Sequence, residues 1–411
     1  MSVEMIYEPK SIDSLMNGQV PSDRALLKDI SVGLEPLTRF IEEQYLTDYI
    51  KRGGSKIKFV TGRPGSGKTH FSTVLTQEAD AQNYLTVSFS ARDVWLHDFK
   101  EIYLEIFRQL DIEHVLKGCA DQIIKDLGFD PDAIGTGKSF MDYLSERGEA
   151  DPISRGEIRT ALRQYFTRNP LLDNNFAYCC SLLTGGILGH PVLETSSREM
   201  ILSFLNGDRN VKLPQLRALG LSPSRITKYN ARYLLRSLAE VVHLAGYAGL
   251  LVMIDDMEQV LNRSVEKGLR YTKMRRDDTY ESIRQLIDDI DNMHHILFLL
   301  VFDRNLLDND NYGIKSYQAL WMRIQNEVVS ARFNRFADII DMDRYADEFY
   351  SAETLCEMSE CLANALQKQG INVAAIGTEE VKELTERAQF GGLGLPWLIN
   401  RTVVKEEKAD V

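Results

Sequence analysis

The residues with the clearest chemical meaning form a glycine-rich segment in the first quarter of the chain. They are Gly62, Arg63, Pro64, Gly65, Ser66, Gly67, Lys68, Thr69 and His70. The first eight fit the pattern GxxxxGK(S/T), and they stand after an apolar stretch and before a helical one, where backbone N–H groups can converge on phosphate oxygens. Lys68 is expected to neutralise the β- and γ-phosphates of a nucleotide and Thr69 to ligate Mg²⁺. Since no NKxD-type guanine signal follows, ATP is expected over GTP as the nucleotide. The expected ligands are therefore ATP and Mg²⁺.

A group of acidic residues follows the apolar run 250–254. Asp255 is expected to hold the water shell of Mg²⁺. Either Asp256 or Glu258 is expected to polarise the attacking water as a general base. Because an aspartate reaches that water less easily than a glutamate, Asp256 predicts slow turnover. The alternative for both acids is a role as solvated helix caps.

Polar and basic residues flank two further apolar runs. Asn305 or Asp303, just after the run 296–302, is expected to hydrogen-bond the γ-phosphate or its water. Arg332 and Arg335 precede the run 338–342, and their permanent charge suits a phosphoryl transition state, including one on a neighbouring subunit of a homo-oligomer. The alternatives are capping of the next turn for the first pair and surface salt bridges for the arginines.

Five short apolar runs predict strands, and they alternate with amphipathic helical patterns. The runs are 57–61, 84–89, 250–254, 296–302 and, more weakly, 338–342. Near-continuous apolar strands separated by helices imply a parallel sheet that is covered on both faces. The predicted class is therefore α/β, with a P-loop core and a five-stranded parallel sheet.

The spacing of these runs predicts the domain organisation. One strand-helix-strand unit needs only about 30 residues, whereas about 140 separate Leu110 from residue 250, so an insertion is expected. We predict an N-terminal segment (1–45), the first half of the core (46–110), a helical insert (111–225), the second half of the core (226–342) and a C-terminal subdomain of two or three helices, lid-like or winged-helix-like (343–411).

Composition limits the possible functions. Of the 411 residues, 44% are hydrophobic and 26% charged, which is typical of a globular protein. No apolar run approaches the roughly 20 residues that cross a bilayer, so no membrane span is expected. The N-terminus lacks an apolar signal core, and the five cysteines form no CxxC pair, which together predict a cytoplasmic protein with reduced thiols.

One basic run stands out in a chain whose net charge is −12. It extends from Arg263 to Arg276, contains Lys267, Arg270, Lys273 and Arg275, and is interleaved with Tyr271. The overall charge argues against bulk binding of nucleic acid, but this run predicts a local contact with DNA. The alternative is a solvated loop.

These residues together resemble the additional-strand branch of P-loop ATPases, the AAA+/STAND group. Within that group the chain resembles the ATP-binding proteins of bacterial BREX phage-defence systems, the BrxD-like group. The resemblance is carried by the segments 18–22, 32–35, 59–71 and 246–250. It implies an AAA+-type ATPase that works with protein partners in a defence complex.

Three departures from the group's pattern bear on activity. Asp256 stands where the family usually has glutamate, and Leu34 stands where related N-terminal motifs carry arginine. The segment 391–397 is similar to the start of a second sensor helix, but Trp397 occupies the usual arginine position, which leaves Arg401 as the candidate substitute.

Two functions remain open from the sequence. The first is a slow Mg²⁺-dependent ATPase that couples its nucleotide state to a partner or to DNA. The alternative is a nucleotide-gated switch or scaffold with little turnover. A metabolic kinase is disfavoured because no acceptor pocket with its own acid and arginine clamp can be assigned.

Overall fold

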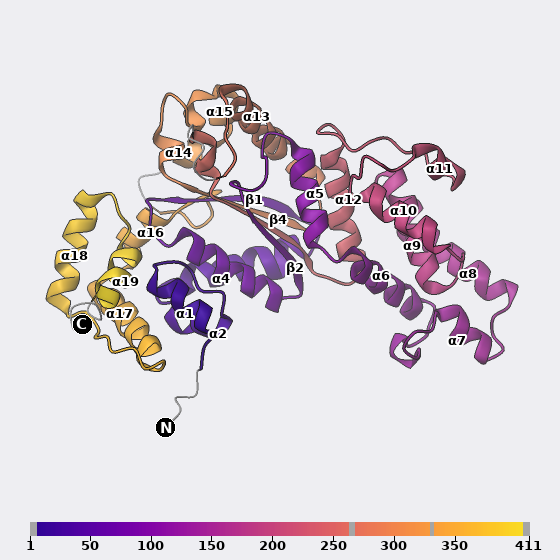
Figure 1. The fold of residues 1–411 in the computed structure, drawn as a ribbon, viewed down its shortest axis with the longest axis horizontal. Coiled ribbons are helices and arrows are strands. Elements are labelled where there is room, and N and C mark those ends of the chain that lie inside the picture. The colour runs from indigo at the N-terminus through magenta and orange to yellow at the C-terminus, as the bar shows by residue number, and fades with distance from the viewer. Residues whose placement is uncertain (1–5, 263–267, 329–332, 406–411) are drawn as a thin grey trace.

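The computed structural model describes residues 6–262, 268–328 and 333–405, and its centre is a five-stranded sheet (Figure 1). The strands run in the order β2-β3-β4-β1-β5, and every neighbouring pair is parallel. This arrangement confirms the predicted α/β class and parallel sheet. The strands are β1 (Ser55–Gly62), β2 (Tyr84–Ser90), β3 (Gly249–Asp255), β4 (Ile296–Asp303) and β5 (Ile339–Asp341).

Side chains on the central strands point alternately to two apolar layers. In β4, Ile296, Phe298, Leu300 and Phe302 join one buried cluster, and Leu297, Leu299 and Val301 join another. Because both faces are buried, the strand reads as an uninterrupted apolar run in the sequence.

Helices from distant parts of the chain cover the two faces. One face packs against α5 (Phe99–Gln109), α12 (Ala231–Leu244) and α13 (Lys273–Asp289). The other packs against α3 (Glu35–Ile41), a π-helical segment (Glu42–Ile50) and α4 (Lys68–Ala81). The remaining elements of the second half of the core are α14 (Asn305–Asp308), α15 (Gln318–Val328) and the 3-10 turns Met257–Leu261, Ile290–Asn292 and Ile314–Ser316. A further 3-10 turn, Pro131–Ala133, and the π-helical Arg163–Thr167 belong to the insertion between β2 and β3.

The insertion between β2 and β3 is helical and extends away from the sheet (Figure 1). Its helices are α6 (Ile112–Asp126), α7 (Phe140–Glu146), α8 (Pro152–Leu162), α9 (Asn174–Leu188), α10 (Thr195–Leu205) and α11 (Leu213–Ala218). Its buried side chains form one continuous cluster with those on the sheet face below α5 and α12. The boundaries predicted for the insert therefore stay predictions, since the buried cluster continues from the sheet into the insert without a break.

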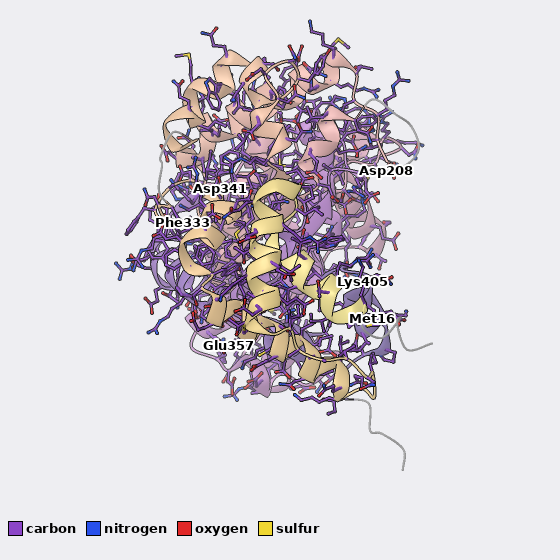
Figure 2. The ribbon with its side chains drawn as sticks, turned by 90° about the vertical axis from the view of Figure 1, so that its left-hand side faces the viewer. Met16, Asp208, Phe333, Asp341, Glu357 and Lys405 are labelled. Carbon is purple, nitrogen blue, oxygen red and sulfur yellow. The ribbon has the colours of Figure 1, made fainter. Side chains whose placement is uncertain are left out.

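Helices from the two ends of the sequence form a third cluster. They are α1 (Pro9–Met16), α2 (Arg24–Ile30), α17 (Ala352–Gln367), α18 (Thr378–Gly391) and α19 (Leu395–Lys405). Figure 2 shows Met16 beside Lys405, and the side-chain amide of Asn400 donates to the carbonyl oxygen of Leu15 at 3.2 Å. With α16 (Met342–Phe349), the described residues 342–405 hold four helices, where the sequence indicated two or three after residue 342.

The register of the sheet aligns the carboxyl ends of its strands. Gly62 of β1 pairs with Asp303 of β4, and Ser90 of β2 pairs with Asp255 of β3. Loops after parallel strands meet at this edge, which is where open α/β sheets bind ligands. Within the described residues, no helix is long and apolar enough to pass through a membrane.

Candidate functional site

The loop between β1 and α4 contains two backbone positions that require glycine. Gly65 and Gly67 have φ of +79° and +88°, in the region that side chains rarely adopt. A Cβ atom at Gly65 would lie only 2.4 Å from the Cβ of Trp397. Helix α4 begins directly after Gly67, so the N–H groups of its first turn lack helical partners beside this loop. The backbone here is suited to an anion.

Lys68 lies at the centre of the carboxyl edge. Its Nζ is 2.7 Å from Oδ1 of Asp303 and donates to the carbonyl oxygens of Gly62 and Arg63 at 3.2 and 3.0 Å. The side chain is only 9% exposed. The tip of β4 therefore supplies the carboxylate that balances this ammonium group in the structure.

Thr69 and Asp255 form an oxygen-rich pair beside the lysine. The Thr69 hydroxyl donates to Oδ2 of Asp255 at 2.9 Å, and the backbone N–H of Asp256 donates to Oδ1 at 2.7 Å. Burial raises the pKa of the Asp255 carboxyl above its usual range despite these two hydrogen bonds. A bound cation would favour its charged form, and hydroxyl and carboxylate oxygens are the ligands that Mg²⁺ prefers.

Asp256 is turned toward β2. Its backbone adopts a left-handed conformation with φ of 57°. Its Oδ2 accepts from the Ser90 hydroxyl at 2.7 Å, and its Oδ1 lies 2.9 Å from Nη2 of Arg92. Both carboxylate oxygens are thus engaged on the side of the sheet away from Lys68. The sequence did not lead us to expect Arg92 at this edge. Its position two residues after the apolar run 84–89 and Ser90 could have indicated a side chain near the carboxyl end of that strand.

Glu258 is turned toward β4. Its Oε2 accepts from the backbone N–H of Asp303 at 3.0 Å. Burial, together with the nearby charge of Asp303, raises the pKa of Glu258 to about 7. A carboxyl group with such a pKa can both accept and release a proton at neutral pH.

The remaining predicted residues of the edge do not join this cluster. Asn305 begins α14 and is exposed, so Asp303 is the side chain at the tip of β4 that reaches Lys68. Arg335 lies on the amino-terminal side of β5, with its guanidinium 4.8 Å from the ring centroid of Phe40. Arg332 lies outside the described residues.

Arg63 ties the loop to the C-terminal helices. Its backbone N–H and its Nε donate to the two carboxylate oxygens of Asp343, at 2.8 and 3.1 Å. Its Nη1 donates to the carbonyl oxygen of Ala388 in α18 at 2.6 Å. Arg63, predicted to bind the nucleotide, therefore contacts α16 and α18.

A second connection joins the loop to α19. The backbone N–H groups of Gly394 and Trp397 donate to the carbonyl oxygens of Pro64 and Gly65, at 2.9 and 3.2 Å. Ser66 is buried at the same contact. A Cβ atom on Gly394 would lie 2.3 Å from the backbone nitrogen of Ser66, so the two segments are tightly packed. Through these bonds the phosphate loop and α19 form one unit.

A cavity of about 430 Å³ opens from the loop between the N-terminal and C-terminal helices. Gly65, Gly67, Lys68, Thr69, His70, Asp255 and Asp256 line one side. The other side is largely apolar and is formed by Val20, Val32, Leu34, Tyr350, Met358 and Leu362. The sequence analysis did not predict this apolar wall, because its residues come from both ends of the chain.

Two polar residues complete the cavity. Asn400 lines it, and the Oδ1 atom of Asn400 is buried without a hydrogen-bond partner among the described residues. The Nε2 atom of His70 lies 2.7 Å from the hydroxyl of Ser31, and burial lowers the pKa of His70 to about 4, which leaves the ring neutral at pH 7. The cavity thus offers a free acceptor beside its apolar wall.

Arg401 is placed against Trp397 instead of the cavity. Its guanidinium lies 5.4 Å from the Trp397 ring centroid, and it is not among the residues that line the cavity. Trp397 itself does line the cavity. In the structure, therefore, an indole occupies the wall where the resemblance to sensor helices leads one to expect an arginine.

The basic run predicted to contact DNA is only partly available at the surface. Arg276 is buried at 3% exposure and lies 5.0 Å from the ring centroid of Tyr312. Arg275 lies 4.2 Å from the ring centroid of Trp95. Arg263 and Lys267 lie outside the described residues, and Arg270 and Lys273 are exposed.

The parallel sheet with β4 between β1 and β3, and the glycine loop that places Lys68 beside Thr69 and Asp255, define a P-loop nucleoside triphosphatase fold. A family model described as BREX system ATP-binding protein BrxC/D matches residues 8–406, and the chain belongs to this family. The resemblance to the ATP-binding proteins of BREX systems seen in the sequence is confirmed. No curated protein matches the chain significantly.

Proposed function

We propose that the chain binds ATP with Mg²⁺ and hydrolyses the ATP slowly, in the cytoplasm, as part of bacterial BREX defence against phages. The observation that carries the proposal is the convergence of Lys68, Thr69 and Asp255 at the mouth of one cavity. The cavity has a charged end and an apolar end, as a nucleotide has.

The nucleotide would lie with its phosphates at the glycine loop and its base against the apolar wall. Lys68 would exchange Asp303 for phosphate oxygens when ATP enters. The free acceptor on Asn400 suits the 6-amino group of adenine, which is a hydrogen-bond donor. Leu34, in place of an arginine, adds to the apolar side of this wall.

Thr69 and Asp255 would hold Mg²⁺, which neutralises charge that develops on the phosphates. No group of three or more His, Cys, Asp or Glu side chains forms a metal cage within the described residues. Such a sparse protein ligand set fits Mg²⁺, which usually keeps several waters and takes further ligands from substrate phosphates.

We assign the proton-accepting role to Glu258. It does not line the cavity, but it accepts from the backbone N–H of Asp303, whose carboxylate contacts Lys68, and its pKa is raised to about 7. Asp256 lines the cavity, but Ser90 and Arg92 engage both of its carboxylate oxygens. Turnover through Asp256 would need those contacts to open first, so Asp256 is the less suitable base.

Coupling to partners would pass through the C-terminal helices. Arg63, Pro64 and Gly65 are bonded to α16, α18 and α19, so a loop that adjusts to nucleotide also moves the attachment of these helices. Their outer surface is a suitable place for protein partners to read the nucleotide state.

Arg335, and Arg332 three residues before it in the sequence, would act on the nucleotide of a neighbouring subunit. Arg335 is exposed on the amino-terminal side of the sheet, away from the cavity of its own chain. The proposal therefore requires a homo-oligomer. Mass measurement with and without ATP tests it, and so does mixing a Lys68→Ala subunit with an Arg335→Ala subunit, which should restore activity.

Calorimetry and phosphate release with wild type, Lys68→Ala and Lys56→Ala test the core of the proposal. Lys56 is a matched control because it lies at the opposite end of β1, paired with Asp338 at 2.6 Å. We expect ATP uptake and Mg²⁺-dependent turnover to be lost in Lys68→Ala only. Absence of ATP uptake by the wild type would refute the proposal, whereas uptake without turnover, with and without DNA, would favour the nucleotide-gated switch.

A further inference from the structure

A second basic surface lies in the insert, outside the run noted in the sequence. The segment 207–232 connects α10 to α12 and includes α11. It carries the exposed cations Arg209, Lys212, Arg217, Arg225 and Lys228, and its one acidic residue is Asp208. Among the described residues none of these five forms an ion pair with a carboxylate. In a chain of net charge −12, such an uncompensated cluster is unusual.

Buried apolar residues hold this segment on the body of the insert. Val211, Leu216, Leu221 and Ile226 belong to the large hydrophobic cluster, and each is at most 9% exposed. The cations occupy positions between these anchors. Their backbone is therefore fixed, so the positive charges form a defined surface.

The surface is concave. Two cavities, of about 320 and 510 Å³, share Arg209 and Arg225 in their walls. Lys212 and Arg217 line the larger cavity, and Lys100 lines the smaller. The Nη1 atom of Arg225 donates to the carbonyl oxygen of Arg209 at 3.0 Å, which fixes the guanidinium between the two cavities. A groove with cations along both parts suits a strand that carries regularly spaced negative charges.

Two exposed tyrosines follow the groove residue Thr227 closely along the chain. Tyr229, just before α12, and Tyr233, in its first turn, are 75% and 60% exposed. The ammonium group of Lys228 lies 5.5 Å from the ring centroid of Tyr229. Surfaces that bind nucleic acids use exposed aromatic rings to stack on bases beside cations that bind phosphates.

Part of the predicted basic run lies against a pair of rings that follow β2. The guanidinium of Arg275 lies 4.2 Å from the ring centroid of Trp95, which is 5.0 Å from that of His97. Burial lowers the pKa of His97, the charges of Arg275 and Lys228 lower it further, and those of Asp98 and Asp278 raise it. Figure 1 shows α11 at the end of the molecule opposite α18.

We propose that the groove formed by the segment 207–232 binds a nucleic-acid strand, with Arg209, Lys212, Arg217, Arg225 and Lys228 on the phosphates and Tyr229 and Tyr233 against the bases. An acidic protein could use the cations, but the pair of exposed rings beside them favours a ligand with bases. This surface does not depend on the nucleotide cavity.

The test measures the fluorescence anisotropy of labelled single-stranded and duplex DNA over a range of salt concentrations. The variant Lys212→Glu/Arg217→Glu/Lys228→Glu reverses three exposed cations whose side chains make no hydrogen bond or ion pair with the described protein. We expect it to bind DNA on the order of 10- to 100-fold more weakly, with a slope of log K against log salt that is shallower by about 2 to 3. Tyr229→Ala/Tyr233→Ala should weaken single-stranded binding with the salt slope unchanged.

Lys117→Glu/Lys125→Glu/Arg155→Glu is the matched control, because it makes the same change in net charge at exposed positions elsewhere in the insert. We expect this control to bind DNA like the wild type. Equal losses in the two triple variants, or no DNA binding by the wild type, would overturn the proposal. Binding of an acidic protein in the absence of any DNA binding would do the same. DNA binding retained in Lys68→Ala would support the groove even if the proposed ATPase activity failed.

Discussion

The contact between Lys68 and Asp303 makes a specific prediction about ATP affinity. In the structure, Lys68 must leave the Asp303 carboxylate, 2.7 Å away, before it can bind phosphates. The variant Asp303→Asn keeps the shape of the side chain and keeps the backbone N–H that donates to Glu258, but it removes the charge. We therefore expect this variant to bind ATP more tightly than the wild type.

The magnitude follows from the type of contact. A hydrogen bond between charged groups contributes about 1.5–3 kcal/mol, and a neutral amide acceptor retains part of that. Asp303 is 26% exposed, so solvent weakens the contact, and a difference of about 1–2 kcal/mol remains. Since about 1.4 kcal/mol corresponds to a factor of ten, the dissociation constant of ATP should fall by roughly 5- to 30-fold.

Titration calorimetry with ATP and Mg²⁺ checks this value. Asp308→Asn is the control, because Asp308 is a nearby carboxylate that pairs with Arg304 and does not contact Lys68. An affinity that is unchanged or weaker in Asp303→Asn would refute the reasoning. It would mean that the Lys68–Asp303 pair does not compete with the nucleotide.

Two further predictions concern the acids and the glycine loop. Because Glu258 has a raised pKa and must lose its proton to act as a base, turnover should rise between about pH 6 and pH 8. Glu258→Gln should lower turnover by about 10²–10⁴-fold. Asp256→Asn should move the midpoint of the pH–rate profile to lower pH, because the charge of Asp256 also raises the pKa of Glu258. A rate of phosphate release by the wild type that does not change with pH would contradict the assignment of Glu258. Gly65→Ala should lower the free energy of unfolding by about 1–3 kcal/mol more than Gly128→Ala. Both glycines have positive φ, but only at Gly65 would the added Cβ atom clash, with Trp397. Equal losses of stability in chemical denaturation would exclude this clash.

Local sequence patterns predicted most of the sheet and the phosphate loop. The strands appear as apolar runs because both of their faces are buried, and the glycine pattern specifies a turn within a few residues. Predicting the tip of β4 was harder. Asp303 and Asn305 both follow the apolar run 296–302, and only the register with Gly62 shows that Asp303 reaches Lys68.

Contacts between distant residues could not be read from the sequence. Arg92 and Asp256 are far apart along the chain, and they meet because β2 lies next to β3 in the sheet. The apolar wall of the cavity was missed for the same reason, since Val20 and Leu34 line it together with Met358, which lies more than 300 residues away along the chain. The periodicity of apolar residues identifies the buried face of each helix, but it does not specify which other element packs against that face.

The joint origin of the cavity from both ends of the sequence has a consequence for biosynthesis. Gly18 to Pro21 and Pro396 to Asn400 both line the cavity, and a cluster of buried side chains joins α1 and α2, on either side of the first segment, to α19. While the chain is still being translated, the glycine loop can exist without the wall that we propose encloses the base. Tight capture of nucleotide must therefore wait until the residues of α19 have emerged from the ribosome, so a chain that stalls before them stays unloaded.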